Sequence, residues 1–311
     1  MKITFFDDYR LGAVTDDGVT PLDSLLDGME NLPPQLVLIR VIKQWSDYQA
    51  KFNAAIDSAE PLSRSQTRLR APAPLPTSIV CLAGNYMESG TLKEKPPQAA
   101  FLKSSYAVIG DGDIMHLPDV PASIFEGEAE MALVIGKRAT KVRSEEALDF
   151  VFGYTNFTDG SARGLSAGMG LPYFMKCQDH FAPIGPYIVT PNEIADPQNL
   201  QVKQWNNGKL THDYNTSDMA YTIAETIAFV TANTTLDAGD VIALGVNHQQ
   251  LHPIQDGDVV EQETEFLGRL TFRVSDGLGR TWERETRAER RSAGAEGATP
   301  QLTGKYADVW N

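Results

Sequence analysis

The chain has 311 residues, of which 42% are hydrophobic and 22% are charged, and its formal net charge is −14. These proportions are ordinary for a globular protein and exclude a fibrous or globally disordered chain. The negative charge repels phosphate backbones and anionic membrane surfaces, and no stripe of Lys and Arg offsets it. We therefore expect binding to neither nucleic acid nor membranes.

The compartment follows from the cysteines and the N-terminus. Only Cys81 and Cys177 occur, far apart, and the first residues lack the apolar core of a secretory signal. No run approaches the roughly 18 apolar residues that a membrane helix needs. The expected location is a reducing cytoplasm.

Residues 1–70 predict a small N-terminal α+β domain. Residues 2–6 and 10–14 are typical of two short strands joined by a polar turn. After Pro33-Pro34, apolar residues recur at spacings of three or four and predict a helix whose buried face holds Leu38, Val41, Ile42, Trp45, Tyr48, Phe52 and Ile56. Residues 61–76 are polar and proline-rich, so we expect an extended linker and place the domain boundary there.

Residues 71–285 predict a larger, β-rich domain, and residues 286–311 a C-terminal tail. Helices are expected near residues 145–151 and from about 219 to 231, without regular alternation of strands and helices. This pattern favours an α+β fold that is mostly β. The β-branched, apolar strand candidates are residues 78–82, 131–135, 187–190, 241–244 and 269–274.

Carboxylates stand at the start of an apolar run that predicts a buried strand, Met131–Ile135. Side chains two apart share one face of a strand, so Glu128 and Glu130 project together, and Glu126 joins them if the strand begins early enough. Burying like charges is unfavourable unless a cation compensates them. Asp159 follows another strand-like run and offers a third carboxylate.

Three carboxylates favour a hard divalent cation, Mg²⁺, with Mn²⁺ or Ca²⁺ as alternatives. Zinc is disfavoured because the five histidines do not cluster near the acidic motif in sequence. Plainer interpretations stay open. An isolated Glu-x-Glu is usually a solvated strand face, and Asp159 could lie in a polar loop after a strand.

Several segments, taken in order, resemble the fumarylacetoacetate hydrolase family over most of residues 72–275. Glu128, Glu130 and Asp159 fall where that family places its three acidic metal ligands. The other similar segments are the first strand with its Asn-Tyr turn (76–86), a Phe-x-Lys step (Phe101-Leu102-Lys103), and the region that supplies the family's active-site lysine, here Lys176 (176–186).

The resemblance implies a mixed β-roll or sandwich of packed sheets with a small N-terminal domain, frequent homodimers, and metal-dependent chemistry on small 2-keto or 1,3-diketo acids. It makes Lys176 a candidate catalytic residue. Arg163, Asp179 and Tyr86 are candidate substrate-binding residues, although Arg163 could instead anchor loop carbonyls or Asp179.

The sequence departs from the family pattern at two places. Many members carry a water-activating His-x-x-Glu pair after the Asn-Tyr turn, where this chain has Ser89 and Leu92. Glu88 and Glu94 are our preferred replacements for the missing base, with Asp179 or His248 also conceivable. The second departure is Val246, which stands where the family has a threonine that helps to hold a substrate carboxylate.

The favoured function is therefore a metal-dependent hydrolase that cleaves a carbon–carbon bond in a diketo acid, either an acylpyruvate or a compound like fumarylacetoacetate. The missing pair favours an alternative, a hydro-lyase, decarboxylase or isomerase acting on a 2-keto acid such as a 2-keto-3-deoxy sugar acid. A non-catalytic family member is the third possibility.

Overall fold

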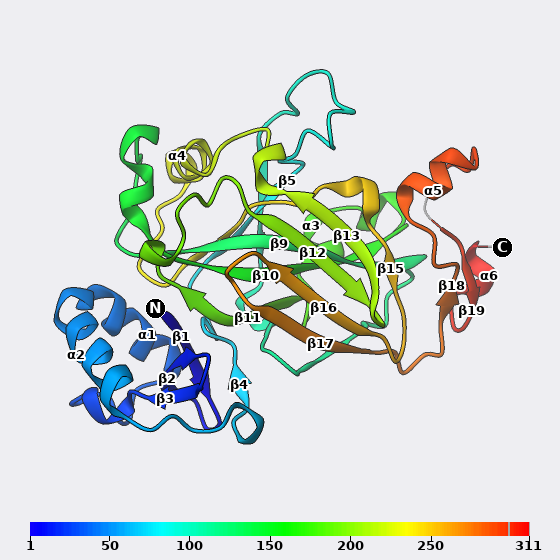
Figure 1. Cartoon of the computed structure of the whole chain (residues 1–311). Coiled ribbons are helices and arrows are strands. Elements are labelled where there is room, and N and C mark those ends of the chain that lie inside the picture. The colour runs from blue at the N-terminus through cyan, green and yellow to red at the C-terminus, as the bar shows by residue number, and fades with distance from the viewer. Residues whose placement is uncertain (298, 311) are drawn as a thin grey trace.

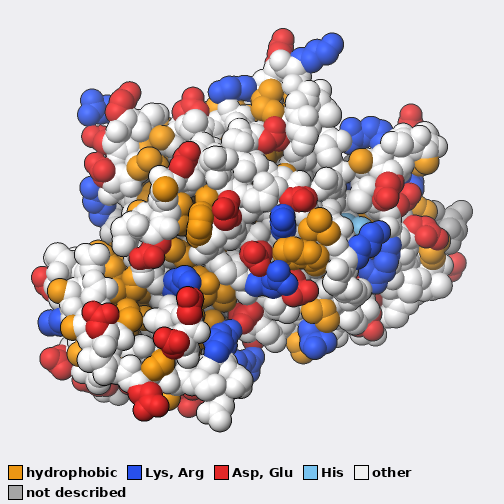
Figure 2. Space-filling model, viewed as in Figure 1, with side chains coloured by type: hydrophobic (Ala, Val, Ile, Leu, Met, Phe, Trp, Pro, Cys, Tyr) orange, Lys and Arg blue, Asp and Glu red, His pale blue; other side chains and the backbone are white. Residues whose placement is uncertain are grey.

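The computed structural model describes every residue of the chain except 298 and 311. Its strands form sheets of twelve, five and two strands (Figure 1). No helix within the described residues combines the length and apolarity needed to cross a bilayer. Acidic and basic side chains are mixed over the face seen in Figure 2, so the negative charge is not gathered into one field there.

The largest sheet is centred on two long antiparallel strands, β9 and β10, which lie side by side from end to end. Every residue of β9 is buried, which fits the continuous apolar run of its second half, Met131–Ile135, and places Glu126, Glu128 and Glu130 of its first half away from solvent. The path through the sheet is β3-β2-β1-β11-β10-β9-β14-β5-β6. Its strands are β1 (Lys2–Phe6), β2 (Arg10–Thr15), β3 (Gly18–Pro21), β4 (Leu69–Arg70), β5 (Ile79–Ala83), β6 (Ala99–Lys103), β7 (Val108–Ile109), β9 (Ile124–Ile135), β10 (Val151–Arg163), β11 (Ala182–Val189), β14 (Val241–Ala243) and β15 (Pro253–Ile254).

The five-stranded sheet packs over one face of β9 and β10. The Tyr214 hydroxyl donates to the Ala129 carbonyl at 2.5 Å, and the Thr158 hydroxyl donates to Gln262 Oε1 at 2.8 Å. Two packed sheets confirm the predicted class, α+β and mostly β. The strands of this second sheet are β8 (Ile114–His116), β12 (Gln201–Asn206), β13 (Lys209–Asn215), β16 (Val259–Thr264) and β17 (Arg269–Ser275).

The N-terminal part contains the two predicted strands, but the helix is divided. The apolar stripe runs through α1 (Pro34–Lys43) and α2 (Trp45–Ser58), which meet at Gln44, whose φ of −115° and ψ of 27° break the helix. Strand β1 pairs antiparallel with β11, so this part extends the large sheet.

The remaining elements are short and lie around the sheets. The predicted helix at 219–231 is α4 (Ile223–Asn233), which begins later because Thr222 and Glu225 form a capping box. The helix predicted near 145–151 is the 3₁₀ helix η4 (Ser144–Phe150). The others are α3 (Pro172–Lys176), η1 (Asp23–Leu25), η2 (Arg64–Gln66), η3 (Ser105–Ala107), η5 (Ala167–Met169), η6 (Pro191–Glu193), η7 (Thr216–Asp218) and η8 (His248–Gln250).

The segment expected to be a C-terminal tail contains regular structure. It holds α5 (Arg287–Ser292), β19 (Gln301–Thr303) and α6 (Ala307–Trp310), and β19 pairs with β18 (Thr281–Trp282). The Gln301 side chain is fully buried and donates to the Ala122 carbonyl at 3.2 Å. This segment therefore packs against the residues just before β9 and against β18.

Candidate functional site

The register of β9 and β10 brings three carboxylates together. Glu128 lies directly opposite Asp159, and Glu130 follows two residues later on the same face of β9. Because Thr158 points toward the five-stranded sheet, its neighbour Asp159 points to the opposite face. Ligand oxygens of the three residues lie within 4.8 Å of one another, and all three side chains are buried.

Two lysines supply positive charge to this cluster. Lys176 Nζ donates to Glu128 Oε1 at 2.8 Å and to Asp159 Oδ2 at 2.5 Å. Lys103 Nζ pairs with Asp159 and donates to the carbonyls of Gly160 at 3.1 Å and Lys176 at 2.5 Å. The Phe-x-Lys step, Phe101-Leu102-Lys103, is the sequence signal that points to Lys103.

The charges of this cluster oppose the effect of burial. Burial would lower the pKa of Lys176, but Asp159 and Glu128 outweigh it and raise the pKa above its usual value. Burial would likewise raise the pKa of Glu128, but Lys176 and Arg163 outweigh it and hold the pKa well below its usual value. Lys176 and Glu128 are therefore both charged.

The surroundings of Glu130 suit a cation in addition to the two lysine ammonium groups. Its Oε2 accepts a hydrogen bond from the Gly245 amide at 2.7 Å, whereas its fully buried Oε1 has no partner among the described residues. Burial, reinforced by Asp159 and Glu128, raises the pKa of Glu130 well above its usual value. An unpaired, buried carboxylate oxygen beside two further carboxylates is the donor set of a hard divalent cation. Glu128, Glu130 and Asp159 would hold that cation.

A second polar pair lies beside the carboxylates, formed by Glu88 and His248. His248 Nδ1 lies 2.7 Å from Glu88 Oε1, and the His248 amide donates to Glu88 Oε2 at 2.9 Å. Glu88 is buried and adopts a positive φ of 55°, which is rare for a residue other than glycine. Burial would raise the pKa of Glu88, but the hydrogen bond and charge of His248 lower it below its usual value.

Asp218 joins the two loops that carry this pair. Its Oδ2 accepts from the Ser89 amide and from Asn247 Nδ2, both at 2.9 Å, and Asn247 Nδ2 also lies 3.0 Å from Ser89 Oγ. Ser89 thus takes part in the link that holds Glu88 and His248 together.

A cavity of about 290 Å³ joins the two groups. Its walls include Glu128, Lys176, Arg163, Val246 and His248. The acidic cluster and the imidazole therefore face one space, into which a small acid can fit.

Three of the predicted site residues neither line this cavity nor form a side-chain hydrogen bond, among the described residues, with those that do. Glu94 is exposed, and Asp179 is exposed in a separate cavity that His116, Cys177 and His180 also line. Tyr86 is fully buried and packs edge-on against Tyr214, with ring centroids 5.1 Å apart. The structure thus brings together the three acidic residues, Lys176, Arg163 and Glu88, and adds Lys103 and His248.

Comparisons with known proteins by sequence and by structure point to the same family. The model of the fumarylacetoacetate (FAA) hydrolase C-terminal family matches residues 78–275. Oxaloacetate tautomerase YisK of Bacillus subtilis (strain 168) is 32% identical over 288 residues, covering 85% of this chain and 95% of the tautomerase. The structure of maleylpyruvate hydrolase from Sphingobium sp. SYK-6 in complex with manganese(II) ion and pyruvate is 32% identical, with a TM-score of 0.81 over 89% of this chain and 100% of that chain.

A further neighbour is the 5-carboxymethyl-2-hydroxymuconate delta-isomerase from Mycobacterium smegmatis, which is 26% identical, with a TM-score of 0.71 over 89% of this chain and 99% of that chain. The relatives thus carry the names of a tautomerase, a hydrolase and an isomerase. The chain itself belongs to the fumarylacetoacetate hydrolase family.

Proposed function

We propose that this protein is a divalent-metal-dependent hydrolase that cleaves a carbon–carbon bond of an acylpyruvate, with Mg²⁺ or Mn²⁺ as the metal. The observation that carries the proposal is that His248, whose Nδ1 is bound by Glu88, lines the same cavity as Glu128 and Lys176. Hydrolysis needs a base for water, and this pair replaces the His-x-x-Glu dyad that the sequence lacks.

The metal, held by Glu128, Glu130 and Asp159, would draw electron density from the keto and carboxylate oxygens of the substrate. The protein's own side chains handle the protons. With Nδ1–H donated to Glu88, the other ring nitrogen of His248, Nε2, is left to accept a proton from water. Glu88 keeps the imidazole in that tautomer and stabilises it once it is protonated.

The hydroxide formed from water adds to the acyl carbonyl carbon, and the bond between that carbon and C3 of the pyruvate unit breaks. The bonding electron pair goes to C3, which then receives the proton that His248 took from water. The products are pyruvate and a carboxylic acid. Lys176 and Arg163, both charged and on the cavity wall, bind and orient the anionic substrate.

The similarity to an oxaloacetate tautomerase supports a second candidate, enol–keto interconversion of a 2-keto dicarboxylic acid. This reaction needs only a proton moved between C3 and the enol oxygen. The Glu88–His248 pair can move it without water entering the reaction.

A substrate panel with product analysis separates these candidates. The protein is incubated with Mn²⁺ and with maleylpyruvate, other acylpyruvates, oxaloacetate or a 2-keto-3-deoxy sugar acid, and products are identified by NMR. Pyruvate plus a carboxylic acid supports hydrolysis. Faster enol–keto exchange of oxaloacetate without cleavage supports tautomerisation, and dehydration or carbon dioxide release points to the lyase alternatives. No turnover across the panel, with Mn²⁺ bound, contradicts both candidates.

A further inference from the structure

We propose that Arg287, which lies beyond the region matched by the family model, is a positioning residue for the metal site. By sharing Glu126 with Arg163, it leaves the Nη2 group of Arg163 available to support the proposed metal ligand Glu128. The inference rests on the metal site of the proposed function, but not on which reaction the enzyme performs.

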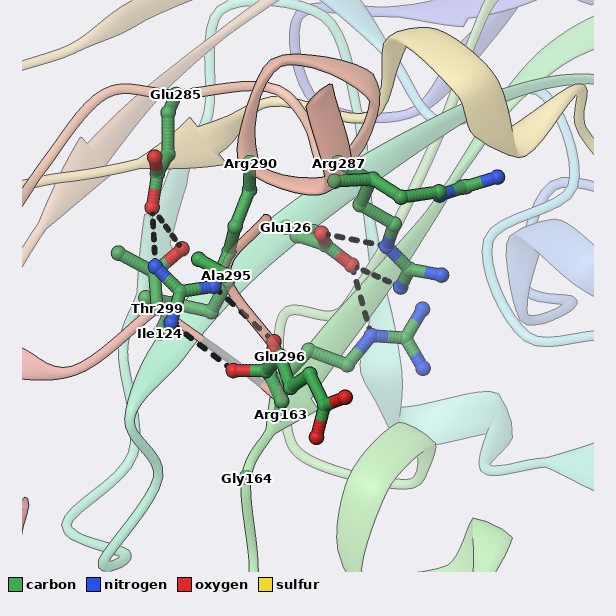
Figure 3. Close-up of a pocket in the computed structure, with 12 residues that line it drawn as sticks. Ile124, Glu126, Arg163, Gly164, Glu285, Arg287, Arg290, Ala295, Glu296 and Thr299 are labelled. Atoms are coloured by element: carbon green, nitrogen blue, oxygen red, sulfur yellow. Dashed lines mark hydrogen bonds and ion pairs between the residues drawn. The ribbon is translucent and has the colours of Figure 1, made fainter. Parts of the chain in front are cut away.

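Glu126 lies between two guanidinium groups at the end of β9 (Figure 3). Arg287 Nε donates to Glu126 Oε1 at 3.0 Å, and Arg287 Nη2 donates to Oε2 at 2.6 Å. Arg163 Nε donates to the same Oε2 at 2.8 Å. The Glu126 side chain is only 2% exposed, so these bonds replace the water that a carboxylate requires.

Arg163 is shared between two carboxylates. Its Nε binds Glu126, and its Nη2 pairs with Glu128 Oε1. Glu128 also accepts from the Ser161 hydroxyl at 2.9 Å. A hydrogen-bonded chain therefore runs from Arg287 through Glu126 and Arg163 to a candidate metal ligand.

The C-terminal segment is fixed where Arg287 leaves it. Arg284 forms a two-pronged ion pair with Asp258, at 2.7 and 2.6 Å, and the Arg287 amide donates to the Leu251 carbonyl at 3.3 Å. Thr286 caps α5 through Glu289. These contacts hold the start of α5 against the segment that follows η8. His248 is the first residue of η8.

Loss of the Arg287 fork would leave Glu126 with Arg163 as its one guanidinium partner among the described residues. Guanidinium groups bind carboxylates best through two parallel hydrogen bonds, so Arg163 would turn toward Glu126 and release Glu128. A cavity of about 510 Å³, lined by Glu126, Arg163 and Arg287, gives the Arg163 side chain room to turn. Glu128 would then lose a partner that orients it for the metal.

Mn²⁺ binding, measured by isothermal titration calorimetry, tests this inference without any assay of turnover. We expect Arg287→Gln and Arg287→Lys each to raise the Kd for Mn²⁺ about tenfold, since loss of a group that supports a metal ligand typically costs about 10- to 100-fold. Lysine keeps the charge but cannot form the two-pronged contact.

Arg291→Gln is the matched control. Arg291 lies in the same helix and lines the same cavity, but its side chain is exposed and has no ion pair within the described residues. Its Kd should stay within about twofold of the wild-type value, well short of the effect expected for a supporting group. In the Glu126→Gln/Arg287→Gln double variant, the amide no longer competes for Arg163, so the Kd should return toward the wild-type value.

A simple charge effect makes the opposite prediction, because removing a positive charge near a cation site tightens binding in Arg287→Gln, while Arg287→Lys remains unchanged. That result would overturn the inference. A loss of Mn²⁺ affinity in Arg287→Gln that the added Glu126→Gln substitution does not restore would also overturn it, because it would indicate a merely structural role for Arg287. Melting temperatures of the metal-free variants check that each is folded. If the wild-type protein binds no Mn²⁺, both this inference and the proposed function fail. If the wild-type protein binds Mn²⁺ and the Arg287 variants bind it with the same Kd, this inference alone fails.

Discussion

His248 and Glu88 are separated by 160 positions in the chain, yet His248 Nδ1 lies 2.7 Å from Glu88 Oε1. The two loops meet because Asp218 accepts hydrogen bonds from both Ser89 and Asn247. The pair proposed to act as acid and base is thus assembled from two segments that lie far apart in the chain.

Removal of the imidazole should affect the chemical step most. We expect His248→Asn to lower kcat by about 10²- to 10⁴-fold, the usual contribution of a general base, with little change in KM. Glu88→Gln should lower kcat less, because the imidazole remains but loses the carboxylate that orients it. Steady-state kinetics on the best substrate of the panel gives both values.

Glu94→Gln serves as the control for that experiment, because Glu94 is an exposed acidic residue outside the cavity. It should have wild-type kinetics. If His248→Asn kept full kcat, the assignment of the base would be wrong.

Lys176 should be needed for turnover of the substrate but not for folding or for metal binding. Lys176 Nζ lies on the cavity wall between Glu128 and Asp159, so Lys176→Met should abolish most turnover while Mn²⁺ still binds. Kinetics and calorimetry on the same preparation check the two halves of this prediction. Unchanged turnover of a good substrate would exclude Lys176 from the mechanism.

Lys103 should matter mainly for stability. Its fully buried ammonium group pairs with Asp159 and donates to two backbone carbonyls. Removing one member of a buried ion pair typically costs about 3–5 kcal/mol, so Lys103→Met should lower the free energy of unfolding by that order. Urea denaturation of the metal-free protein measures the change, and the exposed Lys93→Met is the control. A loss below about 1 kcal/mol would show that the pair is weakly stabilising.

His212 predicts a pH dependence of stability. Both ring nitrogens lack partners among the described residues, and burial lowers the pKa of His212 from 6.5 to about 4. Glu126 and Glu128 act in the opposite sense, while His252 and His248 lower the pKa further. Because the unfolded chain takes up the proton first, the stabilising contribution is complete above pH 6.5 and is lost as the pH falls toward 4.

The loss amounts to about 3 kcal/mol at about 1.4 kcal/mol for each pKa unit. His212→Leu should remove this part of the pH dependence, because it replaces the titrating ring with an apolar side chain. Urea denaturation of both proteins at a series of pH values measures the difference. Identical slopes between pH 6.5 and 4 would contradict the role of His212.

The sequence indicates the parts of this site that depend on local spacing. Alternation along one strand predicts the shared face of Glu128 and Glu130. Asp159 is expected just after a strand-like run, but it lies within β10, directly opposite Glu128. Lys103, the Glu88–His248 pair and Arg287 depend on contacts between distant segments, which no periodicity encodes. The break at Gln44 escaped prediction for a related reason, since the apolar stripe continues across it.

Glu128, Glu130 and Asp159 are the three residues that we propose to hold one divalent cation. Anomalous diffraction from a crystal grown with Mn²⁺ tests this claim most directly. We predict a strong anomalous peak within bonding distance of a carboxylate oxygen from each of the three residues. A peak elsewhere, or none at these oxygens with Mn²⁺ in excess, would contradict the account.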